Sequence, residues 1–204
     1  MNKKVIIGVL IAIILITGGT ILYLDPFKEE VKPEVVEVKA IDNIGKFGYV
    51  LYENKTDVYK EYFNNLKETL NQEIIDEKKY AELLAELFVI DFYTLSNKAS
   101  NTDIGGIEFV HKEAKDTFIL AAKDTIYKYV ESNVYGDRKQ KLPEVATVTL
   151  INTKNEKFTG EKVTDDNCYK VEMNLTYKED MGYPTTVTIT LVHSGEKLYV
   201  VEVK

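Results

Sequence analysis

The 204-residue sequence contains one cysteine, two histidines and no tryptophan. The single cysteine, Cys168, excludes an intramolecular disulfide, so a folded domain must be stabilised by burial of apolar surface. His111 and His193 lie too far apart to form the local ligand pair of a zinc site, and no glycine-rich phosphate loop is present. The sequence therefore predicts no metal site, no cofactor and no set of catalytic residues.

Basic residues are also in the minority. The chain has 26 lysines and arginines against 33 acidic residues, a net charge of −7. An acidic protein repels phosphate backbones, so nucleic acid is not expected as a partner. The 45% hydrophobic and 29% charged residues are typical of a chain with a packed core.

Charged residues are absent from Val5–Leu24, and these 20 residues are enough for a helix that crosses a bilayer. Two lysines precede the run and Asp25 follows it, so residues 1–4 are expected in the cytoplasm and the remainder outside. An uncleaved anchor is favoured over a cleaved signal peptide, because the run is long and no A-x-A-like site follows. A lipoprotein would need a cysteine directly after the run, and a buried core helix would have caps. We therefore predict a single-pass protein of the cell membrane, with the lipid bilayer as partner through residues 5–24.

Residues 25–53 are predicted to form a stalk and linker. Pro26 and Pro33 fix the local backbone, and Gly45 and Gly48 interrupt any regular pattern. A short edge strand at Val35–Val38 is the competing interpretation. An extracytoplasmic domain is then expected over residues 54–204.

Three helices are predicted at the start of this domain. The first covers about 56–71, with Thr56 or Asp57 as its N-cap. The second begins after Asp76 and ends near residue 96, and its broad apolar stripe predicts that it is the most buried helix. The third covers about 112–132. Its small Ala121-Ala122 pair would let a partner approach closely, and its predicted inner face consists of Phe118, Ala121, Ala122, Thr125, Ile126 and Tyr129.

After Glu144 the spacing of apolar residues changes from the helical period of 3.6 to the period of 2 that is typical of strands. Strands are predicted at 145–152, 157–163, 169–177, 187–191 and 198–203. Helices followed by an antiparallel meander indicate the α+β class. The expected fold is an N-terminal transmembrane helix, then about three helices packed on a curled antiparallel sheet of four to five strands.

This order of elements over about 54–204 resembles the nuclear-transport-factor-two-like (cystatin-like) superfamily, in particular the extracytoplasmic domains of bacterial secretion and conjugation assembly subunits. The stretches FVIDFYTLSNK (88–98) and NTDIGGIEF (101–109) also resemble small uncharacterised anchored proteins of Gram-positive bacteria. The resemblance implies a cone between sheet and helices and a place in the cell envelope. Enzymes of the superfamily place a His or an Asp/Tyr set in the cone, and no such set can be assigned in this sequence.

Two groups of residues are candidates for a site. Asp91 lies on the apolar second helix, where burial would raise its pKa and allow it to act as a base, or where it would pair with a lysine or cap the next loop. Three tyrosines could join Asp91 in a ligand pocket, namely Tyr80, Tyr93 and Tyr169. The loop from residue 97 to 106 could contact a partner through Asn97, Asn101 and Asp103, and its Gly105-Gly106 pair permits positive φ or close backbone approach.

Three functions are compatible with these features. A protein-interaction or scaffold domain of a bacterial cell envelope, with another envelope protein or a second copy as partner, is favoured because an anchor and a stalk occur without a catalytic set. A small-ligand-binding domain with a cone-shaped pocket is the alternative. An enzyme that uses Asp91 ranks third.

Overall fold

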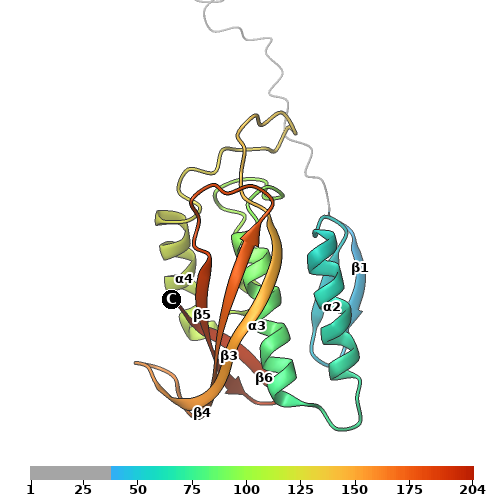
Figure 1. The fold of residues 1–204 in the computed structure, drawn as a ribbon, viewed down its shortest axis with the longest axis vertical. Helices are drawn as coiled ribbons and strands as arrows, with labels where there is room; N and C mark the ends of the chain where they lie inside the picture. The colour runs from blue at the N-terminus through green and yellow to red at the C-terminus, as the bar shows by residue number, and fades with distance from the viewer. Residues whose placement is uncertain (1–37) are drawn as a thin grey trace, which may run out of the picture. The chain divides into compact units, whose positions relative to one another are not determined.

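The computed structural model describes residues 38–204 (Figure 1), so residues 1–37, with the predicted membrane span at 5–24, lie outside the described part. Within 38–204 no helix is long and apolar enough to cross a bilayer. The described part contains three α-helices, a short 3-10 helix, a four-stranded antiparallel sheet and a two-stranded sheet. The α+β class predicted from the sequence is confirmed.

The two-stranded sheet corrects the prediction of a linker that extends to residue 53. Strands β1 (Ala40–Ile44) and β2 (Tyr49–Tyr52) pair antiparallel, and Ile44, Phe47, Tyr49 and Leu51 are buried. The glycines that suggested a loop belong to the turn of this hairpin, where Gly48 has φ of 67°. The domain therefore begins before residue 54.

Helices α2 (Asp57–Leu70) and α3 (Glu77–Tyr93) begin at the caps expected from the sequence. The Thr56 hydroxyl accepts a hydrogen bond from the backbone N–H of Tyr59, and the Asp76 carboxylate accepts one from Lys79. Each cap satisfies a donor that the first helical turn leaves free.

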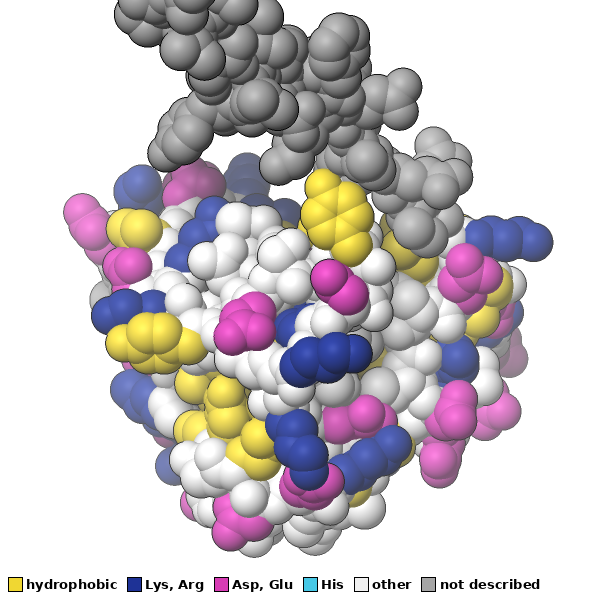
Figure 2. Space-filling view, turned by 90° about the horizontal axis from the view of Figure 1, so that it is seen from above, with side chains coloured by type: hydrophobic (Ala, Val, Ile, Leu, Met, Phe, Trp, Pro, Cys, Tyr) yellow, Lys and Arg dark blue, Asp and Glu magenta, His cyan; other side chains and the backbone are white. Residues whose placement is uncertain are grey.

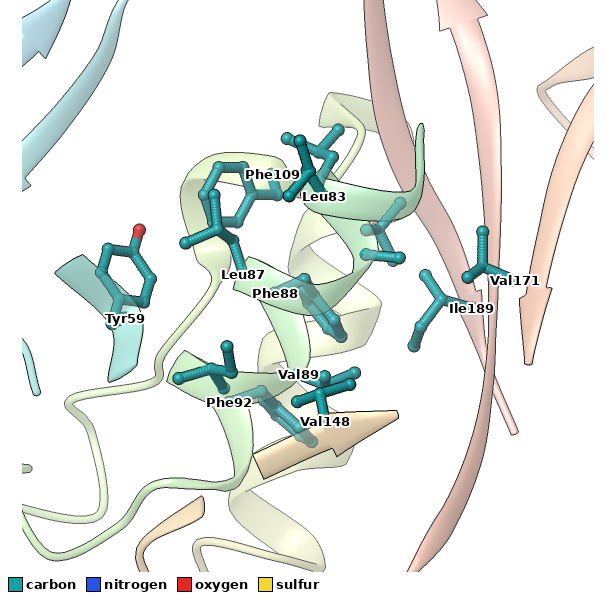
Figure 3. Close-up of a cluster of buried hydrophobic side chains, with 14 of the residues drawn as sticks. Tyr59, Leu83, Leu87, Phe88, Val89, Phe92, Phe109, Val148, Val171 and Ile189 are labelled. Carbon is teal, nitrogen blue, oxygen red and sulfur yellow. The ribbon is translucent and has the colours of Figure 1, made fainter. Parts of the chain in front are cut away.

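Helix α3 is the centre of the core, as its broad apolar stripe predicted. Nearly every residue from Tyr80 to Tyr93 is buried. Figure 3 shows Leu83, Leu87 and Phe88 of α3 between Tyr59 of α2 on one side and Ile189 of the large sheet on the other. A helix that is apolar on all sides is stable in water only when other elements cover it completely.

The large sheet is a meander in the order β3-β4-β5-β6. Its strands are β3 (Val145–Thr159), β4 (Thr164–Tyr177), β5 (Thr186–Ser194) and β6 (Lys197–Val203).

The sequence predicted two strands where β3 forms one. The register of β3 against β4 shifts at three places, including Leu150/Asn152 and Glu156/Phe158. Such bulges bend a strand without ending it, which explains why the alternation breaks while pairing continues. In Figure 1 the β3–β4 hairpin extends beyond the rest of the sheet at its lower end.

Helix α4 (Lys112–Asp124) is shorter than the predicted 112–132 and is only loosely packed. Ala122 is its only buried residue within the helix, and Tyr129, predicted on the inner face, is 76% exposed. The start of α4 is held against β6, because the His111 N–H donates to the Val200 carbonyl at 2.8 Å. Beyond its start, α4 contacts the core mainly through Phe118, which is only partly buried and lies against the Phe88 and Phe92 rings of α3.

Both glycines that precede the 3-10 helix η1 (Ile107–Phe109) are needed for their small size. Gly106 has φ of 73°, and a Cβ atom on Gly105 would lie 2.2 Å from the backbone oxygen of Asp91. The close approach expected from the sequence is thus confirmed, and it brings the loop directly onto α3.

Replacing Gly105 with alanine is expected to lower the free energy of unfolding by about 1–3 kcal/mol, because the backbone of α3 must shift. Gly45→Ala is the matched control, since its nearest neighbour would be the Asn43 side chain at 3.6 Å and its φ is not positive. Urea unfolding of both variants measures the difference. Equal stability of the two variants would show that the loop adapts without cost.

Candidate functional site

An apolar cleft of about 550 Å³ lies beside α4. One wall is α4, which contributes Ala114, Phe118, Ala121 and Ala122. The volume lies within the range of small-molecule pockets, roughly 300–1,000 Å³. We call this cavity the α4 cleft.

Three other elements complete the α4 cleft. The end of β6 contributes the consecutive residues Val200–Val203, and the β3–β4 hairpin contributes Phe158 and Val163. Phe92 at the end of α3 lies 5.2 Å from the Phe118 ring, centroid to centroid. The walls therefore come from four elements that are far apart in the sequence.

Charged side chains stand at the rim of the α4 cleft. Glu113, Glu161 and Glu202 are acidic, and Lys162 is basic. The Lys162 ammonium lies 3.9 Å from the Glu113 carboxylate, which joins the hairpin to α4. Both side chains are well exposed, and exposed ion pairs contribute little to stability. This link across the cleft can therefore open at low cost.

Asp91 lies elsewhere, in a buried cluster at the other side of α3's last turns. Its carboxylate accepts from the ammonium groups of Lys55 and Lys98 and from the Gly106 N–H, all at 2.7 Å. The side chain is 2% exposed. One carboxylate thus joins the segment before α2, the loop after α3 and the start of η1.

The pKa of Asp91 differs from that of a catalytic base. Burial alone would raise it, but the charges and hydrogen bonds of Lys98 and Lys55 outweigh burial and hold the pKa well below its usual range. Of the alternatives open from the sequence, the structure favours pairing with lysine. Because the carboxylate is held by two ammonium groups and stays ionised at a lowered pKa, this geometry does not favour a general-base role.

A small polar pocket of about 230 Å³ lies next to Asp91. Asn97, Asp103 and Glu108 line it together with Asp91. The burial of the Glu108 carboxyl group and the negative charge of Asp91 raise the pKa of Glu108, although the residue as a whole is exposed. Lys55 and Lys98 are both already paired with Asp91, so neither is available to attract an anion.

The loop predicted to contact a partner is largely occupied with its own bonds. Asp103 accepts from the Ala99 N–H at 2.8 Å, and the Asn97 amide donates to the Asn54 carbonyl at 3.2 Å. Asn101 is exposed in the same loop. These contacts fix the loop's conformation.

The three tyrosines predicted beside Asp91 are dispersed. The Tyr80 hydroxyl meets that of Tyr49 at 2.6 Å, eleven residues and about 16 Å along α3 from Asp91. Tyr169 donates to Glu77 at 3.1 Å near the start of α3. Tyr93 lines the α4 cleft, where burial raises its pKa to about 12.

His193 lies close to Tyr169 in a polar cluster at the start of α3. Its Nδ1 atom is 2.7 Å from Asp165, and its Nε2 atom is 3.2 Å from Glu77. Burial would raise the pKa of Asp165, but hydrogen bonds from the backbone N–H groups of His193 and Asn167 outweigh burial and lower it. The cluster ties β4, β5 and α3 together.

The structure therefore divides the predicted site. Asp91, Asn97 and Asp103 share the polar pocket. Of the predicted site residues, Tyr93 is the one that lines the α4 cleft. One sequence feature pointed to the cleft, namely the small Ala121-Ala122 pair that allows close approach. The contributions of Phe158 and Val163 carry no such signal, because they depend on how the hairpin bends.

Comparison of the chain with protein-family models, with curated proteins and with solved structures finds no match. The function is therefore inferred from the chain's own residues.

Proposed function

We propose that the chain is a membrane-anchored binding protein whose domain outside the cytoplasm holds a small apolar ligand in the α4 cleft. The cleft is the observation that carries this proposal. Its walls are mainly aromatic and aliphatic, its volume of about 550 Å³ suits a small molecule, and its charged lining residues are exposed or half-buried. The proposed anchor is the uncharged run Val5–Leu24.

The rim indicates the class of ligand. Three acidic side chains and one basic side chain surround the opening, and the basic one, Lys162, lies near Glu113. An anionic head group would meet this negative rim unfavourably. A neutral or cationic amphiphile, with its apolar part in the cleft, is therefore preferred to a fatty acid.

Helices that precede an antiparallel meander, together with a cleft between a helix and the sheet, support membership of the nuclear-transport-factor-two-like superfamily as part of this proposal. The role of a protein-interaction domain, which the sequence favoured, ranks second. The α4 cleft gives a small molecule a binding cavity with a defined lining, and this observation is why ligand binding ranks first.

Ala121→Trp is expected to weaken binding of a neutral apolar dye roughly tenfold, because the indole ring would fill the cleft. The fragment from Val35, where the compact unit begins, would be titrated with 1-N-phenylnaphthylamine and its fluorescence followed. The unmodified fragment contains no tryptophan, so tryptophan emission would come only from the variant.

Leu120→Trp is the matched control. Leu120 is the neighbouring residue on α4 and is exposed, but it does not line the cleft. Its substitution should leave dye affinity unchanged. Equal effects of the two substitutions, or the absence of saturable binding to the folded fragment, would refute the proposal.

A further inference from the structure

Four loops meet at one end of the domain, drawn at the top in Figure 1. They join β2 to α2, α3 to η1, α4 to β3, and β4 to β5. Bonds between them fix this arrangement: Asn133 N–H donates to the Ala99 carbonyl at 2.7 Å, and Lys141 pairs with Glu179 at 3.2 Å. We call this surface the loop end.

Exposed apolar side chains are concentrated at the loop end. Nine large hydrophobic residues are exposed among residues 38–204, and five of them lie in or beside these loops. Tyr129 is 76% and Tyr135 64% exposed. The five are Val38, Tyr52, Tyr129, Val134 and Tyr135. Exposed apolar groups that gather on one surface mark an interaction site.

The loop between α4 and β3 is weakly basic in an acidic chain. Residues 125–144 contain four basic and three acidic side chains, whereas the chain as a whole carries −7. Figure 2 views this end from above and shows hydrophobic and basic side chains beside acidic ones. Tyrosine next to lysine and arginine is the composition that proteins place at a bilayer–water interface.

Internal bonds hold this loop in one conformation. The Arg138 guanidinium donates to the carbonyls of Ser96 and Lys98, and the Gln140 amide donates to the Tyr129 carbonyl at 2.7 Å. Exposed side chains on a fixed loop can enter an interface without a large loss of conformational entropy.

The place where the chain enters the domain favours the bilayer as the partner of the loop end. The described domain begins at residue 38, which lies at the loop end, and the polar pocket brings Val38 next to Tyr52 and Asn97. Thirteen residues, 25–37, separate it from the apolar run. Even when fully extended they span no more than about 47 Å, so a bilayer that holds the proposed anchor is within reach of the domain.

We propose that the loop end rests on the surface of an anionic bilayer, with Tyr129 and Tyr135 at the interface and the exposed Lys128 and Lys139 ammonium groups near the lipid phosphates. This inference rests on the anchor proposed above.

The test uses the full chain in vesicles of phosphatidylglycerol and phosphatidylcholine. Val134→Cys and Ile74→Cys would each be labelled with the same polarity-sensitive dye, and the native Cys168 is buried. Ile74 is 86% exposed in the loop between α2 and α3, at the opposite end of the domain. Lipids that carry a quencher should reduce emission at position 134 at least about twofold more than at position 74.

Lys139→Glu combined with Tyr129→Ser should reduce this difference. Equal quenching at the two positions, in a chain that floats with the vesicles, would overturn the inference and leave the anchor intact. A chain that does not float with the vesicles would overturn both the inference and the anchor. The dye at position 134 could instead report an apolar environment in detergent, and report it more strongly as the protein concentration rises. That result would identify a second copy as the partner, which also overturns the inference.

Discussion

Replacement of Asp91 by alanine is expected to lower the free energy of unfolding by about 3–5 kcal/mol. The substitution leaves the ammonium groups of Lys55 and Lys98 without their shared partner, and it removes the acceptor for the Gly106 N–H. Small proteins are stable by only about 5–15 kcal/mol, so this variant should be barely folded. Urea unfolding followed by the near-ultraviolet circular dichroism of the tyrosines measures the loss.

Glu196→Ala is the control for Asp91. Glu196 also pairs with a lysine, Lys46, but both side chains are highly exposed, so little change in stability is expected. An Asp91→Ala protein as stable as the Glu196→Ala protein would show that the buried cluster is not a major source of stability.

Replacement of Glu86 by glutamine is expected to have the opposite effect at alkaline pH. Glu86 is 4% exposed on α3, and its Oε2 atom has no hydrogen-bond partner in residues 38–204. Burial, with a smaller contribution from Glu82, raises its pKa from 4.5 to about 7, although Lys79 opposes the shift.

The sign of the pH dependence follows from this raised pKa. Between pH 4.5 and 7 the folded chain keeps a proton on Glu86 that the unfolded chain has released, so this residue's contribution to stability falls as pH rises. The total loss is about 3 kcal/mol. Glu86→Gln should therefore be more stable than the wild type by about 2–3 kcal/mol at pH 8 and similar to it at pH 4.5.

Urea unfolding of both proteins at the two pH values isolates the effect of Glu86 from that of other titrating groups. Glu68→Gln, an exposed substitution on α2, is the control and should show no such difference between pH values. A stability difference between wild type and Glu86→Gln that is the same at both pH values would contradict the raised pKa.

The sequence predicted the features that depend on local pattern. The caps at Thr56 and Asp76, the burial of α3 beyond its first turn and the close approach of Gly105 all follow from nearby residues. The β1–β2 hairpin was missed because its strands are short and its turn glycines also suit a loop. The early end of α4 was missed because its apolar spacing continues to Ile126, beyond the end of the helix.

The site was harder to predict because it depends on contacts between distant segments. Asp91 and Lys55 are 36 positions apart, so the sequence could not decide between a base with raised pKa and an ion-paired acid. The α4 cleft combines α4 with the ends of β6 and of the β3–β4 hairpin. Its existence depends on how the long, bulged hairpin bends, which no local pattern specifies.

Chemical shifts of alanine methyl groups provide the most direct test of the proposed cleft. Ala114, Ala121 and Ala122 line it, whereas Ala81 and Ala85 lie in the buried part of α3 and Ala99 lies at the loop end. Addition of a neutral single-chain amphiphile below its micelle concentration should shift the methyl signals of the first three residues and leave the others unchanged. Shifts confined to Ala99, or no shift at the three cleft alanines, would contradict the proposal that this protein binds an apolar ligand beside α4.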